Sequence, residues 1–492
     1  MSENKKAYKQ ILFMVLLSLA TQLVALVRMS AAAKVFGTSV SMDAYNFCNS
    51  FATFLFSFIS TGISTVLIPA IVQKKNMKLL NTFITVIYLF SMAAVGLLVL
   101  CRRPISVLFS SGSGEFVAAA SSLMFIALGS QFMHTVIGVA VAVFQCREKY
   151  NVPKIFTFIT GAVLMGLVVA DRDLTIYRYA LYVFATTAAN GVLHFLFAYK
   201  EQFLYKPSLA LKEPGLWDLF QTFLPTVFSA GLYQISLLTD SLVSSVLGPG
   251  SISTLTYSNN IMSLVSTLLT SNIILYIYPK IAAEIQKEEG REKLFEYGAF
   301  FTGVMLLIAA GFFSAGKEGI ALLYQRGAFT AETTGRVFGC TLIYVTGLPI
   351  NVFRDVIYRF FYAKGLTGVT FTNSVTASLF NIVVSILLSR LIGLYGIALG
   401  TVLAGLLSLT GILVRFVRRF GIPRNNIKWL GKELLKCLIS GTAAVSAVYL
   451  VKCFGFVESH AAAFLLYGFI CVVIYAGSML LMRTKLLKIR LG

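Results

Sequence analysis

The stretch LIGLYGIALGTVLAGLLSLTGILV, residues 391–414, contains no Asp, Glu, Lys or Arg. At 1.5 Å per residue, a helix of this length crosses the hydrocarbon core of a bilayer, which is about 30 Å thick. Similar charge-free runs occur at 79–101, 179–199, 297–316, 365–389 and 461–482. The sequence therefore predicts an all-α polytopic membrane protein.

The composition of the 492-residue chain supports this prediction. Hydrophobic residues make up 57% of it and charged residues only 12%, about half the charged fraction of a soluble domain. The net charge of +21 falls in short gaps between apolar runs, whereas nucleic-acid-binding proteins concentrate it in soluble basic patches. The seven cysteines form no C-x-x-C pair, and no phosphate-binding G-x-x-x-x-G-K-S/T motif occurs. We expect no enzyme, no metal, no cofactor, no nucleotide and no nucleic-acid partner.

About fourteen membrane spans result when runs that carry one or two charges are added. We place them at 8–36, 41–72, 79–101, 115–145, 154–171, 176–199, 216–247, 251–279, 296–316, 331–363, 366–389, 392–415, 433–452 and 461–482. With the N-terminus in the cytoplasm, 28 of the 41 Lys and Arg fall in cytoplasmic segments and 10 in outer segments. This asymmetry predicts that both termini are cytoplasmic and that the number of spans is even.

A weak internal repeat suggests two lobes. Gly37 and Pro69 bracket the second span, and Gly248 and Pro279 bracket the eighth. Coincidence among Gly and Pro in membrane helices is the alternative explanation. A true repeat gives a parallel pair of six-helix lobes, residues 1–205 and 206–425, followed by two further helices in 426–492. Many secondary transporters are built from such repeats and bind substrate between them, near the midplane.

Charged residues inside the predicted spans mark candidate binding sites, because a charge in the hydrocarbon core costs at least about 2.5 kcal/mol. Arg28 in span one and Asp240 in span seven occupy nearly equivalent places in the repeat. Two interpretations remain open. They form a buried ion pair that joins the lobes, or Arg28 binds an anion and Asp240 balances its charge when the cavity is empty.

A second charged group lies in span ten. Asp355 and Arg359 are spaced i and i+4 in the favourable order for pairing along a helix, which leaves Arg354 without a local partner. We expect Arg354 to line a wet cavity, whereas Arg359 either joins it or extends to the interface. Arginine suits this role because its planar guanidinium binds phosphate oxygens bidentately. Polar side chains that add donors for sugar hydroxyls, or that only bond neighbouring helices, are Gln234, Asn259 and Asn260.

The stretch LYQRGAFTAETT, residues 323–334, closely resembles the outer-loop motif of the MurJ-type lipid II flippases, a branch of the multidrug/oligosaccharidyl-lipid/polysaccharide exporter superfamily. Its most specific residues are Arg326, Gly327, Ala328 and Phe329. Residues 27–37 with Asp43 resemble the family's first helix and turn, residues 234–238 its seventh helix, and residues 359–365 the end of its tenth helix. The resemblance covers most of the chain. It implies a V-shaped pair of lobes, a cationic cavity for a lipid diphosphate, and a groove at helices 13 and 14 for the polyprenyl tail.

The chain also departs from the family pattern. Phe56 and Ser57 stand where an arginine pair is usual in helix 2, and Asn259-Asn260 where Asp-Arg is frequent in helix 8. Residues 366–370 replace the usual Asp-Thr-Arg-Thr-Pro. Of the cavity arginines of the family, only Arg28 is kept. These departures concern the cargo rather than the fold.

We therefore expect a flippase of the bacterial cytoplasmic membrane. Its predicted cargo is a polyprenyl-diphosphate-linked saccharide, with lipid II first, and cell-wall synthesis proteins are candidate partners. Flippases for capsule, exopolysaccharide or teichoic-type units are the alternative, and a non-transporting membrane scaffold is another. A cation-coupled drug exporter fits less well, because its cavity would more naturally carry unpaired acids.

Overall fold

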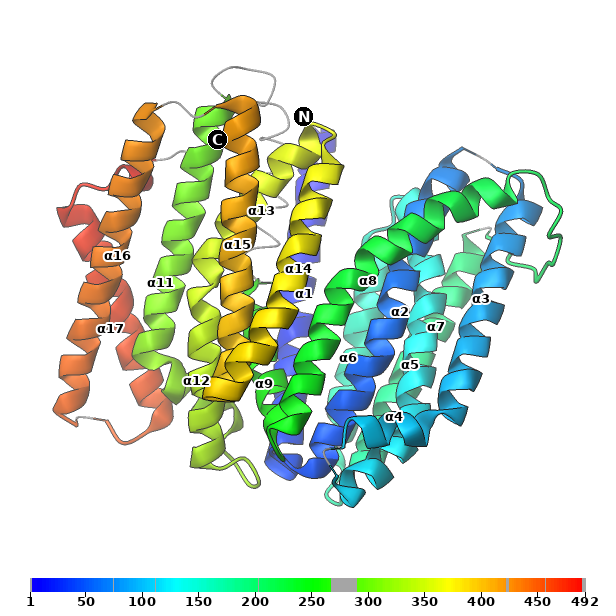
Figure 1. Ribbon diagram of the computed structural model, residues 1–492, viewed down its shortest axis with the longest axis horizontal. Coiled ribbons are helices and arrows are strands. Elements are labelled where there is room, and N and C mark those ends of the chain that lie inside the picture. Colours follow the sequence, from blue (N-terminus) through cyan, green and yellow to red (C-terminus); the bar gives the residue numbers. More distant parts are fainter. Residues whose placement is uncertain are drawn as a thin grey trace. The chain divides into compact units, whose positions relative to one another are not determined.

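Every regular element in the described part of the chain is a helix, as the computed structural model shows (Figure 1). The described residues are 2–73, 75–110, 112–201, 203–266, 290–421, 424–455 and 457–488. Internal contacts divide the chain into two compact units, Met1–Ser253 and Thr254–Gly492. The predicted lobe boundaries at 205 and 425 stay a prediction.

The first unit is a bundle of helices joined mostly by short turns. Several of these helices begin at a Ser or Thr whose hydroxyl accepts a backbone N–H, such as Ser39, Ser113 and Thr175. The helices are α1 (Ser2–Phe36), α2 (Val40–Val72), α3 (Met77–Leu100), α4 (Arg102–Leu108), α5 (Gly114–Cys146), α6 (Asn151–Ala170), α7 (Ile176–Lys200) and α8 (Leu216–Val246).

The second unit holds most of α9 and the helices that follow it. Figure 1 shows α11 packed among α12, α13, α16 and α17, with α14 beside α15. Its described elements are α9 (Ser251–Val265), α11 (Gly290–Tyr324), α12 (Ala331–Thr346), α13 (Leu348–Ala363), α14 (Thr367–Ile392), α15 (Leu394–Phe420), α16 (Arg424–Cys453), α17 (His460–Leu481) and the short η2 (Lys485–Lys488).

Eleven segments of the described residues are helical, long and apolar enough to cross a membrane. They correspond to eleven of the fourteen predicted spans. Of the other three, the predicted spans 41–72 and 216–247 coincide with α2 and α8, which have 33 and 31 residues. The predicted span 251–279 lies partly outside the described residues. The chain is a multi-pass helical membrane protein.

The predicted span 331–363 consists of two helices, which meet at Gly347. Pro349 lies in the first turn of α13, where its missing N–H costs no helical hydrogen bond. The N–H of Gly347 is bonded to the carbonyl of Tyr344, so α12 closes with a tight turn. Gly347 itself keeps a right-handed helical backbone conformation, with a φ of −78° and a ψ of −17°. The short helix α4 was not expected from the sequence.

Glycines allow α14 and α15 to pack closely. A Cβ on Gly396 would lie 2.3 Å from the carbonyl oxygen of Leu388, and one on Gly400 would lie 2.6 Å from Ser385 Oγ. Real Cβ contacts are essentially never this short. Small residues drive helix association in membranes because dispersion replaces the hydrophobic effect there.

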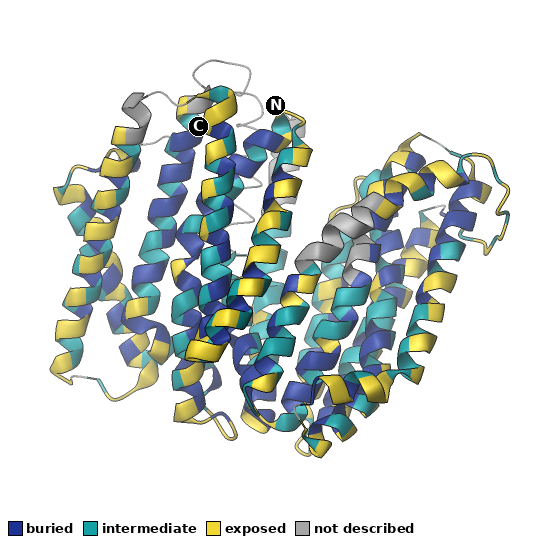
Figure 2. Cartoon of the chain, in the orientation of Figure 1, coloured by how far each residue is buried: buried dark blue, intermediate teal, exposed yellow. Residues whose placement is uncertain are grey.

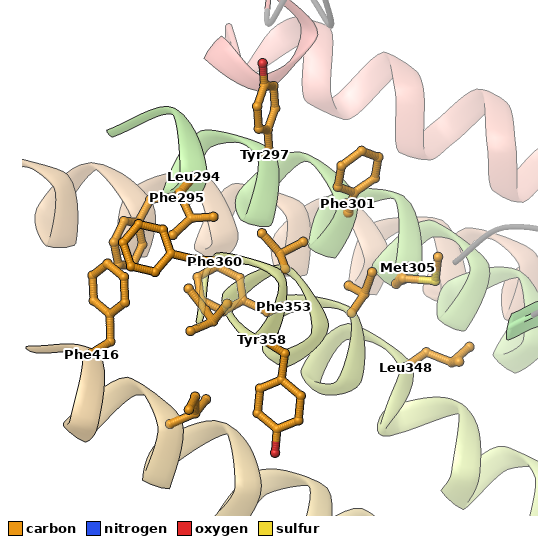
Figure 3. Packing of buried hydrophobic residues seen from close by; sticks show 14 of the residues in the cluster. Leu294, Phe295, Tyr297, Phe301, Met305, Leu348, Phe353, Tyr358, Phe360 and Phe416 are labelled. Carbon is orange, nitrogen blue, oxygen red and sulfur yellow. The ribbon is translucent and has the colours of Figure 1, made fainter. Parts of the chain in front are cut away.

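Aromatic side chains fill the core of the second unit between α11, α13 and α15. Phe295, Phe353, Phe360 and Phe416 lie together in Figure 3, and the ring centroids of Phe360 and Phe416 are 5.0 Å apart. Exposed residues instead run along the sides of helices such as α14 and α16 (Figure 2). Many of them are leucines, including Leu387 and Leu435, as expected of a lipid-facing surface.

Candidate functional site

The predicted site residues fall into groups that lie within single units. In the first unit, Arg28 projects from α1 about 12 Å before the helix ends at Phe36. Its Nε is buried and has no hydrogen-bond partner among the described residues. Its charge interacts with Tyr45 on α2, which is hydrogen-bonded to Tyr179 on α7. The ring centroids of the two tyrosines are 5.1 Å apart. A buried guanidinium nitrogen is thus available to an acceptor.

Two other predicted residues lie on α8. The side chain of Asp240 is buried, with 8% of the residue exposed, six residues before the helix ends. Gln234 lies nearly two turns earlier and is half-buried. On α9, Asn259 is exposed and Asn260 is half-buried, and Ser263 Oγ donates a hydrogen bond to the carbonyl of Asn260. Pairing of Arg28 with Asp240 stays a prediction.

Asp43 joins the start of α2 to the turn between α8 and α9. It is buried, and its Oδ2 accepts the backbone N–H of Gly250 at 2.6 Å while its Oδ1 accepts that of Ser253 at 2.7 Å. Asn46 Nδ2 donates to Ser253 Oγ at 3.1 Å, one turn further along α2. The carboxylate thus satisfies N–H groups at the start of α9, where an anion is favoured. Asp43 also lines a cavity of about 420 Å³, whose walls include Ser110, Ser113 and Ser245.

In the second unit, the polar face of α13 carries the charged residues of predicted span ten. Arg354 is not without a local partner, and that expectation was wrong. Its Nε–H and Nη2–H both donate to Oδ1 of Asp355, at 3.1 and 2.8 Å. The expectation considered only i, i+4 pairs, but the arginine side chain is long enough to reach the carboxylate of the next residue. Arg359 stacks on the ring of Tyr362, 5.8 Å from the ring centroid.

The sequence did not reveal a polar network next to this face. Asn373 Nδ2 donates to the hydroxyl of Tyr358 at 2.9 Å and to the carbonyl of Ser408 at 2.8 Å, and Asn373 Oδ1 accepts from Arg415 Nη1. Tyr358, Asn373 and Arg415 come from α13, α14 and α15. Asn and Ser within apolar helices were the available signal, but the sequence gives no indication of which of them meet.

The residues of the outer-loop motif form the turn between α11 and α12. Gly327 has a φ of +56°, and the N–H of Phe329 is bonded to the carbonyl of Arg326 at 3.1 Å. Phe329 is buried with Tyr324 and Tyr257, with ring centroids 5.3 to 5.6 Å apart. Arg326 and Ala328 are exposed, and Arg326 Nη2 donates to the carbonyl of Leu322. The motif thus encodes a packed turn that presents one arginine.

An apolar cavity of about 340 Å³ lies between α11 and α16. Most of its walls are aliphatic or small side chains, so it suits a hydrocarbon chain better than a polar group. It is lined by Leu306, Ala309, Ala310, Phe313, Cys437, Leu438, Gly441, Thr442, Val445 and Ser446. The tail groove was predicted at 426–492, and one wall of this cavity, α16, belongs to that segment.

Comparison with known proteins decides the family. The family model of the lipid II flippase MurJ matches residues 32–470, which is most of the chain. The chain belongs to the MurJ family. Members of this family are flippases rather than catalytic enzymes.

Relatives of this MurJ-family chain are moderately distant. A probable lipid II flippase MurJ of Helicobacter pylori strain J99 is 26% identical over 303 residues, which cover 61% of this chain and 65% of that protein. The match thus spans just under two thirds of its length. A probable lipid II flippase MurJ of Vibrio cholerae is 23% identical over 441 residues, 82% of each chain.

Solved structures support the same fold. A lipid II flippase MurJ in an inward closed conformation superimposes with a TM-score of 0.82 at 21% identity, covering 97% of this MurJ-family chain and all of the other. An inward-facing multidrug resistance MATE family transporter of the MOP superfamily gives a TM-score of 0.64 at 15% identity, with 82% of this chain and 98% of the other covered. The fold is that of MurJ and MATE proteins.

Proposed function

We propose that this MurJ-family chain is a flippase that moves a polyprenyl-diphosphate-linked saccharide, lipid II before others, from the inner to the outer leaflet of the bacterial cytoplasmic membrane. Fourteen spans in two six-helix lobes, with helices 13 and 14 beside them and both termini cytoplasmic, form the proposed architecture. The lobes alternate between inward- and outward-open states while the tail of the cargo stays in lipid.

The buried Nε of Arg28 carries this proposal. A buried donor without an acceptor costs about 1–3 kcal/mol, and more for a charged group. A phosphate oxygen would remove that cost, because guanidinium and phosphate form strong charge-assisted hydrogen bonds. Gln234, Asp240, Asn259 and Asn260 supply the polar and charge-balancing groups of the proposed cavity.

The second cationic group is the polar face of α13. Arg354, Asp355 and Arg359 together carry a net charge of +1. Because Arg354 is held by Asp355, a diphosphate must compete with that carboxylate for the guanidinium. We infer that this competition lets the face hold the head group weakly enough to release it.

The apolar cavity between α11 and α16 is the proposed site of the polyprenyl tail. Its lining of Leu306, Ala310, Gly441 and Val445 offers a hydrocarbon chain a surface without charges. A polyprenyl tail that moves from the surrounding lipid into this cavity gains little free energy, because both environments are apolar. The cavity therefore orients the cargo and adds little to its affinity.

The contacts of Asp43 with Gly250 and Ser253 lie within the first unit and join the start of α2 to the turn before α9. The outward path of an anionic head group is downhill in an inside-negative potential, which supplies about 2.3 kcal/mol per charge per 100 mV. Flipping that continues unchanged after the potential of sealed vesicles is collapsed would contradict this source of energy.

One observation favours a cargo other than lipid II. Phe56 is 2% exposed, so the place of a usual family arginine is filled by a packed aromatic ring. Fewer cavity arginines suit a head group with other contacts, such as a capsule, exopolysaccharide or teichoic-type unit. A scaffold that moves nothing is the remaining alternative, and it requires that substitutions of Arg28 and Arg354 be silent.

A rescue assay tests the proposal. Cells depleted of their own lipid II flippase express this chain, and the fraction of lipid II in the outer leaflet is measured. We expect restored exposure that is lost with Arg28→Ala but kept with Arg336→Ala, which alters an exposed arginine paired with Glu332. Absence of rescue, with protein present in the membrane, would refute lipid II as cargo.

A further inference from the structure

Three helices of the second unit meet in the polar network around Tyr358. The hydroxyl of Tyr358 lies 3.1 Å from Ser408 Oγ on α15, 3.2 Å from Ser374 Oγ on α14, and 2.9 Å from Asn373 Nδ2. Its ring also serves a second purpose, because the guanidinium of Arg354 lies over it, 5.6 Å from the centroid. Tyr358 therefore connects α14 and α15 to Arg354, which lies on α13.

Asn373 is the centre of this network, because both ends of its amide are used. The nitrogen donates to Tyr358 and Ser408, and the oxygen accepts from Arg415. The side chain is 3% exposed, so water does not substitute for these partners. The position of the amide depends on Gly411, where a Cβ would lie 2.5 Å from Asn373 Oδ1.

Arg354 is constrained from two directions. Asp355 holds its Nε and Nη2, and the face of Tyr358 supports the plane of the guanidinium. Tyr358 belongs to the same buried cluster as Phe353, Phe360 and Phe416, and Figure 3 shows its side chain pointing away from Phe353 and Phe360, with the hydroxyl outermost. The orientation of this ring, and with it that of Arg354, depends on hydrogen bonds from α14 and α15.

We propose that Tyr358 and Asn373 are positioning residues that set the orientation of Arg354 toward the diphosphate of the cargo. This inference rests on the proposed function of Arg354. A cation–π contact with an aromatic ring helps to fix the plane of a guanidinium, and that orientation matters for planar, bidentate phosphate recognition. We call the series Arg415, Asn373, Tyr358 and Arg354 the relay. Arg415 donates a hydrogen bond to the side-chain oxygen of Asn373 and is the end of the relay, not a ligand of the cargo.

A purely structural network makes a different prediction. If the hydrogen bonds only join α13 to α14 and α15, their loss lowers stability and affects binding to the same extent with or without Arg354. If they act through Arg354, their loss has no effect on binding once Arg354 is gone. Non-additivity between residues in contact is the signature of such coupling.

The test is a double-mutant cycle on purified full-length protein in detergent. The probe is geranylgeranyl diphosphate, with geranylgeraniol as the ligand that lacks the diphosphate. Tyr358→Phe removes the hydroxyl and keeps the ring, and Gly411→Ala displaces Asn373. We expect Arg354→Ala to weaken diphosphate binding about tenfold, and each of the other two about threefold. In the Arg354→Ala background, neither should weaken it further.

The matched control is Tyr475→Phe, which removes another buried tyrosine hydroxyl, bonded to the carbonyl of Gly303 at 2.8 Å. It should leave the affinity for the diphosphate unchanged, and all variants should bind geranylgeraniol equally. The relay is overturned if Tyr358→Phe leaves diphosphate affinity unchanged. It is also overturned if Tyr358→Phe weakens that affinity equally with and without Arg354. Full-strength diphosphate binding by both Arg354→Ala and Arg28→Ala overturns the proposed function itself. Loss with Arg28→Ala alone overturns only the relay.

Discussion

The backbone N–H of Gly250 donates to Asp43 Oδ2 at 2.6 Å, across 207 positions of sequence. Gly250 has a φ of +83°, and a Cβ on it would lie 2.9 Å from the carbonyl oxygen of Thr38. Only glycine fits this close approach. One carboxylate thus holds the turn before α9 against the start of α2, and a small residue makes the contact possible.

Asp43→Asn should open this contact. An amide keeps one acceptor oxygen and brings an N–H₂ group against a backbone donor, so a charge-assisted hydrogen bond of about 1.5–3 kcal/mol is lost. The readout is the reaction rate of Ser245→Cys, in the cavity beside Asp43, with a membrane-impermeant maleimide. We expect a faster reaction when Asp43→Asn is combined with Ser245→Cys than with Ser245→Cys alone. An equal rate would show that the Asp43 carboxylate does not restrict access to this cavity.

Asp355→Asn should tighten diphosphate binding. The substitution removes the carboxylate that competes for Arg354, and a partly exposed ion pair of this kind contributes about 0.2–1 kcal/mol. We expect a gain in affinity of about 1.4- to fivefold for geranylgeranyl diphosphate, measured by titration. Glu332→Gln, which loosens the exposed pair with Arg336, is the control and should have no effect. Weaker binding by the Asp355→Asn variant would indicate that Asp355 orients Arg354 rather than competing for it.

In the turn at 325–330, the packing role of Phe329 and the role of the exposed Arg326 can be tested separately. Phe329→Ala leaves a cavity beside Tyr257 and Tyr324 and should destabilise the protein by about 3–5 kcal/mol. Arg326→Ala removes an exposed side chain and should change stability by less than about 1 kcal/mol. Both are measured by denaturant unfolding in detergent. If Arg326→Ala leaves stability intact yet abolishes rescue in cells, the arginine acts in transport.

Filling the apolar cavity should weaken binding of the tail alone. Gly441→Trp places an indole between α11 and α16, so geranylgeraniol and geranylgeranyl diphosphate should both bind less well. Inorganic diphosphate has no tail, and its binding should not change. Leu435→Trp, at an exposed position of the same helix, is the matched control. Unchanged binding of geranylgeraniol to the Gly441→Trp variant would place the tail elsewhere.

The sequence predicted the all-helical, membrane-spanning character of the chain because membrane insertion is a local property. A run of about 20 apolar residues must satisfy its own backbone hydrogen bonds, so helix and span follow from the run itself. The break at Gly347 was missed because the apolar character continues through Pro349. Hydropathy indicates which residues are buried in lipid, but it does not indicate where one helix ends and the next begins.

The site was less accessible from the sequence. Charge within an apolar run singled out Arg28 and Arg354, and the resemblance singled out Asp43 and the turn at 325–330. The local rule for ion pairs then gave Asp355 to Arg359, whereas the structure pairs Asp355 with Arg354. Contacts such as Asn373 with Arg415, 42 positions apart, depend on how helices pack, which one sequence does not reveal.

The glycine contacts of α14 with α15 have a consequence for motion. Backbones this close cannot slide past each other without a clash, so the two helices must travel as a single rigid body. Asn373 and Arg415 lie one on each helix, and their bond is therefore carried unchanged through any rearrangement of the second unit. Tyr358 lies on α13, beyond that body and after the break at Gly347. Motion of α13 relative to this body would therefore act first on the hydrogen bond between Tyr358 and Asn373.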